Sequence, residues 1–248
     1  MRSPAVAGLF YPSTKKECVE FIDSAGVEEK ACSSVVISPH AGWIFSGKTS
    51  IHSIQALKNS GASRFLLIGP SHYFSEGAFL SGQDWKTPFG VARKDESLLK
   101  ELGFEVSDYF HAKEHSIEVQ IPFLQYFFKK FTFAALLLGD QSWSSCRQIA
   151  SLIPDDVTLI ASSDFTHYEP EAIAREKDLK ALKFVNNLEA EKFNRHVENN
   201  NLSICGYGAV TIAVEIAKIR SKKPKLLDFS NSGETGRGVV NYVSFAFV

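Results

Sequence analysis

The sequence predicts an α/β fold, a single domain with a central, largely parallel and buried sheet flanked by helices. Strand-like and helix-like segments alternate along the chain, which is the pattern of α/β proteins. The strand-like runs are continuously apolar, as expected of strands covered on both faces. No internal repeat, low-complexity stretch or Pro/Gly/Ser-rich linker interrupts the 248 residues. One domain over residues 1–248 is therefore expected.

The first half of the chain predicts two strand–helix units. Residues 34–38 form a short apolar run that predicts a buried strand, and a helix is expected over 47–59. Residues 64–68 predict the next strand. A short helix is expected over 95–102, with Asp95 as its N-cap, because an aspartate side chain accepts the free backbone N–H groups of a first helical turn.

The middle of the chain predicts a longer helix and then a strand, a helix and a strand. The longer helix is expected over 114–130, with a kink at Pro122. Its apolar side chains recur at helical spacing: Ile117, Ile121, Leu124 and Phe128. The strands are expected over 132–138 and 157–161, with the helix between them over 142–152.

The last third predicts three helices and two closing strands. The helices are expected over 170–187, 189–199 and 207–220. The strands are expected over 226–229 and 239–247, joined by a glycine-rich turn over 232–238.

Composition and charge argue against several classes of protein. The formal net charge is −1, so no electrostatic case exists for binding nucleic acid or an anionic membrane. No apolar run reaches the length of about 18 residues that predicts a transmembrane helix. The N-terminus lacks the apolar core of a signal peptide. The four cysteines form no CxxC pair, which disfavours a structural zinc knuckle. A cytoplasmic protein with free thiols is expected.

Two histidines follow strand-like runs in similar turns. His40 lies in Pro39-His40-Ala41-Gly42 and His72 lies in Gly69-Pro70-Ser71-His72. Proline favours extended backbone before it and glycine permits a tight turn, so each imidazole is held at a strand end. Open α/β sheets place their chemistry at these ends. We expect His40 and His72 to supply half of a four-coordinate metal site. The alternative is that each caps a buried carbonyl.

A third histidine follows the strand over 157–161. Asp164 and His167 are three residues apart and share a face if the turn is helical. A carboxylate beside an imidazole fixes its tautomer and raises its basicity. We expect Asp164 to orient His167, which would act as an acid/base. The alternative is that Asp164 or Ser163 caps the next helix.

His115 is a further acid/base candidate. It shares the start of the 114–130 helix with Glu118, again three residues away. The alternative is an ordinary surface helix start, where Glu114 or Glu118 stabilises the N-terminal dipole.

Cys205 lies where a loop enters the helix over 207–220 and is followed by Gly206. A thiol near a helix N-terminus has a lowered pKa, which predicts either a soft metal ligand or a nucleophile. The alternative is a buried, inert cysteine.

Motifs along the whole chain resemble those of the Memo (mediator of cell motility) family. Residues 2–12, RSPAVAGLFYP, resemble its opening, and residues 230–233 resemble its C-terminal turn. Five stretches between them resemble its other motifs in order: 39–47, 69–72, 114–124, 162–167 and 204–206. The resemblance covers essentially the whole chain.

The resemblance implies a fold similar to class III extradiol dioxygenases, which are non-haem iron enzymes. It also implies a metal site of two histidines and a cysteine, here His40, His72 and Cys205. The same pocket would be lined by His115, Asp164 and His167. A dioxygenase iron centre uses two histidines and a carboxylate. The thiolate softens the site, admits iron, copper(I) or zinc, and counts against ring cleavage.

Three functions are compatible with these residues. The first is a mononuclear metal protein, with iron or copper favoured and zinc as an alternative, and with redox or oxygenase-type chemistry. The second is a non-catalytic module that binds a small molecule or a peptide in the same pocket. The third is a metal-free hydrolase or transferase with Cys205 as nucleophile and His167 or His115 as base.

The resemblance also implies protein partners. Prokaryotic members are called protein B of the AmmeMemoRadiSam system, which links them by name to a radical-SAM protein and an AMMECR-type protein. No nucleic acid and no membrane is expected as a partner.

Overall fold

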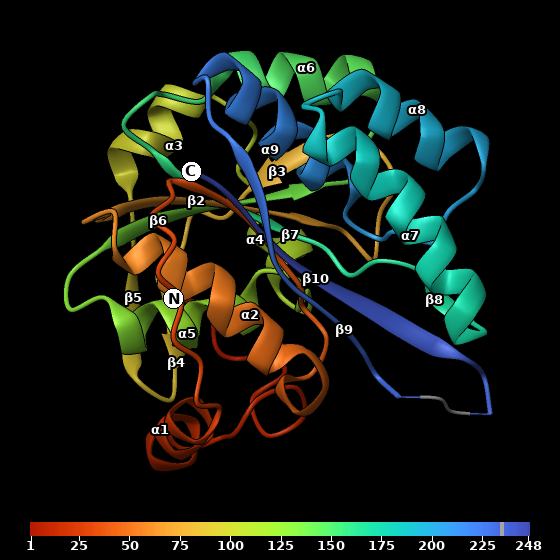
Figure 1. Cartoon of the computed structure of the whole chain (residues 1–248). Helices are drawn as coiled ribbons and strands as arrows, with labels where there is room; N and C mark the ends of the chain where they lie inside the picture. Colours follow the sequence, from red (N-terminus) through yellow and green to blue (C-terminus); the bar gives the residue numbers. More distant parts are fainter. Residues whose placement is uncertain (234–235) are drawn as a thin grey trace.

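A parallel sheet forms the centre of the molecule (Figure 1). The computed structural model describes residues 1–233 and 236–248. Its central strands run parallel to their neighbours in the order β5-β6-β2-β7-β1. They are β1 (Val35–Ser38), β2 (Arg64–Pro70), β5 (Gly90–Lys94), β6 (Thr132–Leu138) and β7 (Thr158–Ser162). The predicted α/β class with a largely parallel central sheet is confirmed.

Antiparallel strands extend both edges of this sheet. At one edge β10 pairs with β1, and both β8 and β9 pair with β10. At the other edge β4 pairs with β5, while β3 pairs with β6. Their bounds are β3 (Ala78–Leu80), β4 (Trp85–Thr87), β8 (His167–Glu169), β9 (Pro224–Asn231) and β10 (Val239–Phe247).

Four of the central strands, β1, β2, β6 and β7, contribute side chains to two hydrophobic cores, one on each face of the sheet. In β1, Val35 and Ile37 belong to one core and Val36 to the other. All three side chains are fully buried. Because successive side chains of a strand point to opposite faces, a strand between two helical layers must be apolar at every position. This explains the uninterrupted apolar runs in the sequence.

Helices cover both faces of the sheet (Figure 1). One core is closed by α3 (Glu96–Leu102), α6 (Trp143–Leu152), α7 (Glu171–Asn186), α8 (Ala190–Asn199) and α9 (Tyr207–Ile219). The other is closed by α1 (Lys15–Ser24), α2 (Trp43–Lys58) and α5 (Ile121–Phe127). In the described part of the chain, no helix combines the length and the apolar character needed to cross a membrane.

Most predicted helices and strands are confirmed with small shifts of their ends. Asp95 caps α3 as predicted, because its carboxylate accepts the N–H of Leu98 at 2.9 Å. The helix predicted over 47–59 begins earlier, at Trp43, where Gly42 takes the N-cap position. All four cysteines are free, as predicted.

The helix predicted over 114–130 is wrong in its first turn and at its end. Only a 3₁₀ turn, η1 (Glu118–Gln120), and α5 are helical there. The buried Glu114 carboxylate accepts the N–H groups of His115 and Ser116, which forms a turn before the helix. Pro122 lies in the first turn of α5, where its missing N–H costs no hydrogen bond, so no kink results.

Several short elements were not predicted from the sequence. They are α1, α4 (Asp108–His111), β3, β4, β5 and β8. The turn predicted over 232–238 includes Glu234 and Thr235, which lie outside the described residues.

Candidate metal centre

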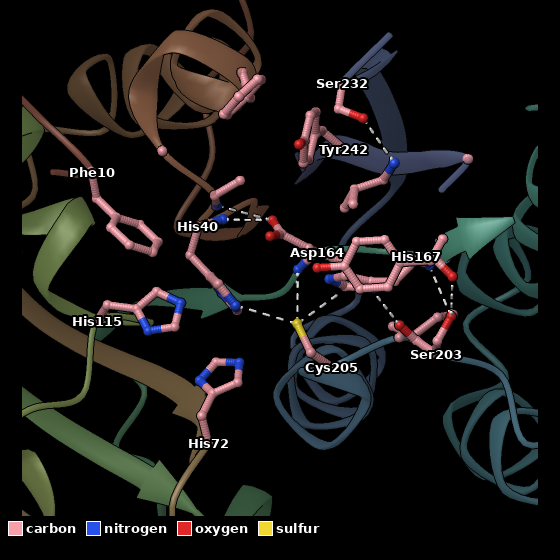
Figure 2. Close-up of a pocket in the computed structure, with 17 residues that line it drawn as sticks. Phe10, His40, His72, His115, Asp164, His167, Ser203, Cys205, Ser232 and Tyr242 are labelled. Atoms are coloured by element: carbon pink, nitrogen blue, oxygen red, sulfur yellow. Dashed lines mark hydrogen bonds between the residues drawn. The ribbon is translucent and has the colours of Figure 1, made fainter. Parts of the chain in front are cut away.

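A cavity of about 740 Å³ opens at the carboxyl ends of β1, β2 and β7 (Figure 2). The structure brings together all six site residues predicted from the sequence. The cavity is lined by His40, His72, His115, Asp164, His167 and Cys205. Their convergence follows from topology, because parallel strands bring their carboxyl ends to one edge of the sheet.

Three potential ligand atoms lie close together in this cavity. One ring nitrogen of His40, one of His72 and the Sγ of Cys205 all lie within 4.8 Å of one another. Nε2 of His40 is 3.2 Å from this Sγ, and the two imidazole rings meet edge to face, with their centroids 5.6 Å apart. His40 follows β1, His72 follows β2, and Cys205 precedes α9. Three separate segments therefore present one donor each.

Ser162, the last residue of β7, and Asp164, just after it, hold His40 in place. The backbone N–H of His40 donates to Oδ1 of Asp164 at 2.7 Å, and its Nδ1 lies 3.0 Å from Oγ of Ser162. Burial, together with the nearby rings of His115 and His72, lowers the pKa of His40 well below its usual value. This ring is therefore neutral at pH 7, which is the state a metal ligand requires.

Glu114 holds His72 from behind. Its Oε1 accepts from Nδ1 of His72 at 2.9 Å, and its Oε2 accepts the backbone N–H of His72 at 2.8 Å. Burial alone would raise the pKa of Glu114, but its hydrogen bonds with His72 and Ser116 outweigh that effect and lower it. Because an ionised carboxylate only accepts, Nδ1 of His72 is the donor and Nε2 faces the cavity. Burial lowers the pKa of His72, but Glu114 outweighs this and the net shift is upward.

A second group of possible ligands, His72, Glu114 and His115, overlaps the first. Oε1 of Glu114 already accepts from Nδ1 of His72 and from the backbone N–H groups of His115 and Ser116. Oε1 thus already accepts from three donors, which makes Glu114 a support for His72 and favours the first group as the metal site.

Cys205 is not an activated thiol. Burial, reinforced by the charge of Asp164, raises the pKa of its thiol. The lowered pKa expected from the helix N-terminus is therefore wrong, and so is the basis for a metal-free nucleophile. The Sγ accepts the backbone N–H of Asp164 at 3.3 Å. A metal ion would deprotonate this thiol on coordination, so metal binding would not need a low pKa of the free thiol.

His115 stacks on His72, with ring centroids 4.5 Å apart, and also contacts the ring of Phe10. Burial lowers the pKa of His115 to about 4, so the ring is neutral at pH 7 and can accept a proton. Glu118, three residues after His115, is engaged elsewhere. Glu118 lies 2.6 Å from Arg2 in a buried ion pair and also accepts from the Tyr11 hydroxyl.

Asp164 does not orient His167, in contrast to the prediction. Oδ1 of Asp164 accepts the N–H groups of His40 and Ala41, and burial raises the pKa of this carboxyl to about 6. His167 is oriented by Ser203, whose carbonyl accepts from Nδ1 at 2.7 Å. The reason is local structure: β8 begins at His167, so the chain is extended and not helical there.

Sequence reasoning missed the residues that hold the site residues in place. Glu114 was considered only as a charge at a helix start, while Ser162 and Ser203 were not considered as partners of histidines. One signal was present: Ser162 and Ser163 follow the apolar run of β7 directly, and buried hydroxyls at such a place need hydrogen-bond partners.

The donor set fits a transition metal better than a hard cation. Imidazole and thiolate ligands suit iron, copper and zinc, whereas calcium and magnesium prefer oxygen. Among the described residues that line the cavity, none is lysine or arginine, so no fixed cation competes for the place of an ion.

The family model and the sequence relatives agree on one family. A family model described as Memo-like protein matches residues 2–248. A MEMO1 family protein of Thermoplasma volcanium is 41% identical, over 100% of this chain and 97% of its own. One from Methanosarcina barkeri is 34% identical, over 100% of this chain and 99% of its own. A crystal structure of an uncharacterized Escherichia coli K12 protein covers 79% of this chain and 91% of its own, with a TM-score of 0.49 and 13% identity.

Proposed function

The chain belongs to the Memo family, and on that premise we propose that it is a metal-dependent protein whose His40, His72 and Cys205 hold one ion. The observation that carries the proposal is the approach of three donor atoms to within 4.8 Å of one another. Each histidine also has its second ring nitrogen in a hydrogen bond, to Ser162 in one case and Glu114 in the other. Such support behind a ligand is typical of metal sites.

The charges around the site favour a divalent ion. A coordinated Cys205 thiolate, the ionised Glu114 and Asp164, which is ionised at pH 7 with a pKa of about 6, each carry a negative charge; both carboxylates are buried and Cys205 is partly buried. Buried charge is costly unless it is compensated. Iron(II) or zinc(II) compensates more of this negative charge than copper(I) does. Iron(II) and zinc(II) are therefore our first candidates, with copper(I) after them.

We further propose that the site is catalytic. A bound ion supplies a Lewis-acid or redox centre beside an open cavity. His115 is neutral at pH 7 and stacks on His72, so its ring lies next to the metal-binding atoms; its lowered pKa makes it a weak base there. His167 donates Nδ1–H to the Ser203 carbonyl, which leaves Nε2 as an acceptor. These two histidines are the acid/base candidates of an oxidoreductase of this kind.

The test is the metal content of the protein after anaerobic purification and after loading with iron(II), zinc(II) or copper(I). We expect one equivalent of iron or zinc in the wild type. His40→Ala and Cys205→Ser should each weaken binding by more than about 100-fold, beyond the usual effect of removing a supporting residue.

His52→Ala is the matched control, because His52 is a partly buried histidine of α2 that pairs with Glu29. It should keep the metal. Full occupancy in His40→Ala or Cys205→Ser would contradict the proposal.

A second candidate is a non-catalytic module that binds a small molecule or a peptide. The cavity lining includes exposed aromatic side chains, Phe45 at 51% and Tyr168 at 67% exposure, which favour an apolar ligand. Ligand binding that survives removal of metal by a chelator would support this candidate over the first. The radical-SAM and AMMECR-type partners stay predictions.

A further inference from the structure

Ser162 lies behind His40 with every hydrogen-bonding position of its hydroxyl in use. The residue is fully buried at the end of β7. Its Oγ lies 2.6 Å from the carbonyl oxygen of Ser116, 3.0 Å from Nδ1 of His40 and 3.2 Å from Nε2 of Gln120. A hydroxyl can donate one hydrogen bond and accept two. The question is which of these three contacts is the donated one.

Two carbonyl groups determine which partner donates in each of these hydrogen bonds. The Ser116 carbonyl can only accept, so the single hydrogen of Ser162 goes there. The Pro39 carbonyl can also only accept, so the Gln120 amide turns its Nε2 toward Pro39, at 2.8 Å. The second hydrogen of that amide then donates to Ser162. The Gln120 oxygen accepts from the hydroxyl of Ser38 at 3.0 Å, which completes the network.

His40 is left with one possible arrangement. Since Ser162 has given its hydrogen to Ser116, its contact with Nδ1 is a hydrogen bond only if Nδ1 carries a proton. A neutral imidazole has a single N–H, so Nε2 is unprotonated. This is the nitrogen that lies 3.2 Å from the Sγ of Cys205 (Figure 2).

We infer that Ser162 is a positioning residue that selects the Nδ1-protonated tautomer of His40 and thereby presents Nε2 to the metal. The inference rests on the proposed function, because it assigns Ser162 a role in the same site. Glu114 does for His72 what Ser162 does for His40. The two supports differ in charge, since one is a carboxylate and the other a neutral hydroxyl. The backbone N–H of His40 donates to the Asp164 carboxylate, and this hydrogen bond does not involve Ser162. Removing the Ser162 hydroxyl therefore removes the control over the tautomer of His40 but keeps His40 attached to Asp164.

The experiment compares wild type, Ser162→Ala and a control, Ser53→Ala. Ser53 is equally buried, and its hydroxyl bonds the Ile37 carbonyl and Ser244, away from the cavity. The tautomer of His40 is read from the nitrogen-15 shifts of its ring in the metal-free protein. Zinc affinity is measured by competition with a chelator.

We expect a single tautomer of His40 in the wild type, with the proton on Nδ1. Ser162→Ala should show a mixture or the opposite tautomer and bind zinc about 10- to 100-fold more weakly, the range seen when a partner of a metal ligand is lost. Ser53→Ala should keep both properties of the wild type.

A proton on Nε2 of His40 in the wild type, or unchanged zinc affinity in Ser162→Ala, would overturn the inference. If Ser162→Ala does not fold, the tautomer of His40 in the wild type is the test: a proton on Nδ1 supports the inference and a proton on Nε2 overturns it. A wild type that shows the expected tautomer and binds no metal would contradict the proposed function instead, so the two failures are distinguishable.

Discussion

Glu114 joins two parts of the site through one buried carboxylate. It accepts the ring and backbone N–H groups of His72 and the backbone N–H groups of His115 and Ser116. A buried carboxylate needs such compensation, since its desolvation is costly. The same contacts orient His72 and form the turn that carries His115. Local structure and metal-binding geometry therefore depend on the same side chain.

Replacing Glu114 with glutamine should cost both stability and metal affinity. An amide offers one acceptor oxygen and directs an NH₂ group at the remaining donors. We expect Glu114→Gln to lose about 3 kcal/mol of unfolding free energy, typical of charge-assisted hydrogen bonds, and about 10- to 100-fold in zinc affinity. Urea denaturation and chelator competition measure the two effects. Glu105→Gln, at an exposed site, is the control, and equal behaviour of both variants would contradict this role.

Asp178 should make stability depend on pH. It is buried among Thr166 and Asn241, and burial raises its pKa to about 6, against about 3.9 in an unfolded chain. Between these values the folded state binds more protons, so stability falls as pH rises from about 4 to 6. We expect Asp178→Asn to gain stability relative to wild type by up to about 3 kcal/mol from pH 4 to pH 7.

Urea denaturation of wild type and Asp178→Asn at several pH values tests this. Asn241 can turn its amide oxygen toward the new NH₂ group, so the variant has a hydrogen-bonded alternative. A stability difference that does not change with pH would show that Asp178 titrates normally.

The ligands of the site were easier to predict than their supports. His40 and His72 follow apolar strands directly, so topology alone brings them together. Cys205 was a candidate from its place before a helix, and the family resemblance assigned it to the same site. The supports are tertiary contacts: Glu114 is 42 residues from His72, and Ser162 is 122 residues from His40. The raised pKa of Cys205 could not be predicted from the sequence either, because the burial of a loop residue depends on what packs over it.

The loop before α9 lies close to the end of β7, and this close contact sets the position of Cys205. Gly206 makes this approach possible, since a Cβ there would lie 2.3 Å from the Ser162 carbonyl oxygen and 2.8 Å from Cβ of Ser163. Both obstacles are atoms of a central strand end that cannot move freely. The loop must therefore shift if Gly206 gains a side chain.

Gly206→Ala should displace Cys205 from the two histidines. We expect a loss of about 1–3 kcal/mol in stability, as for other overpacked sites, together with weaker zinc binding. Gly42→Ala is a matched control beside His40, because its added Cβ meets no atom closer than 3.6 Å. Thermal unfolding and zinc competition measure both. Wild-type zinc affinity in Gly206→Ala would mean that Cys205 is placed by other contacts.

Buried apolar strands could be predicted, whereas the shortest strands could not. The strand predicted over 132–138 matches β6 at both ends, because six apolar residues in a row after Thr132 strongly indicate a buried strand. The strands β3, β4 and β8 have three residues each, too few to show an alternating pattern. The helix predicted over 114–130 was wrong for another reason. The helical spacing of apolar residues continued through a turn that the Glu114 carboxylate holds in place.

Across the whole molecule, Arg2 connects the first residues of the chain to the segment that carries Glu114 and His115. Its guanidinium is almost fully buried, pairs with Glu118 at 2.6 Å and lies 4.2 Å from the ring centroid of Trp85. It also donates to the carbonyls of His111 and Glu114. The N-terminal segment is thus part of the support of the turn that carries His115.

Arg2→Ala should be strongly destabilising, because it leaves the Glu118 carboxylate buried without its cation. We expect a loss of about 3–5 kcal/mol, measured by urea denaturation. The double variant Arg2→Met with Glu118→Gln should lose clearly less, since no uncompensated charge remains. Equal losses in the single and double variants would contradict a role for the charge pair.

The fold class followed from alternation and apolar runs, but the strand order did not. Nothing in the sequence indicated that β10 would pair with β1 and carry β8 and β9 at the edge. Such pairings join residues far apart in the chain, and their choice depends on how whole layers pack. The likeness to extradiol dioxygenases stays a prediction.

The most direct test of the central claim is X-ray absorption spectroscopy at the metal edge of the protein loaded with one equivalent of iron(II) or zinc(II). We expect one sulfur and two imidazole nitrogens among the atoms bonded to the ion, with the sulfur signal lost in Cys205→Ser. A spectrum of the wild type without sulfur at the metal would contradict the claim.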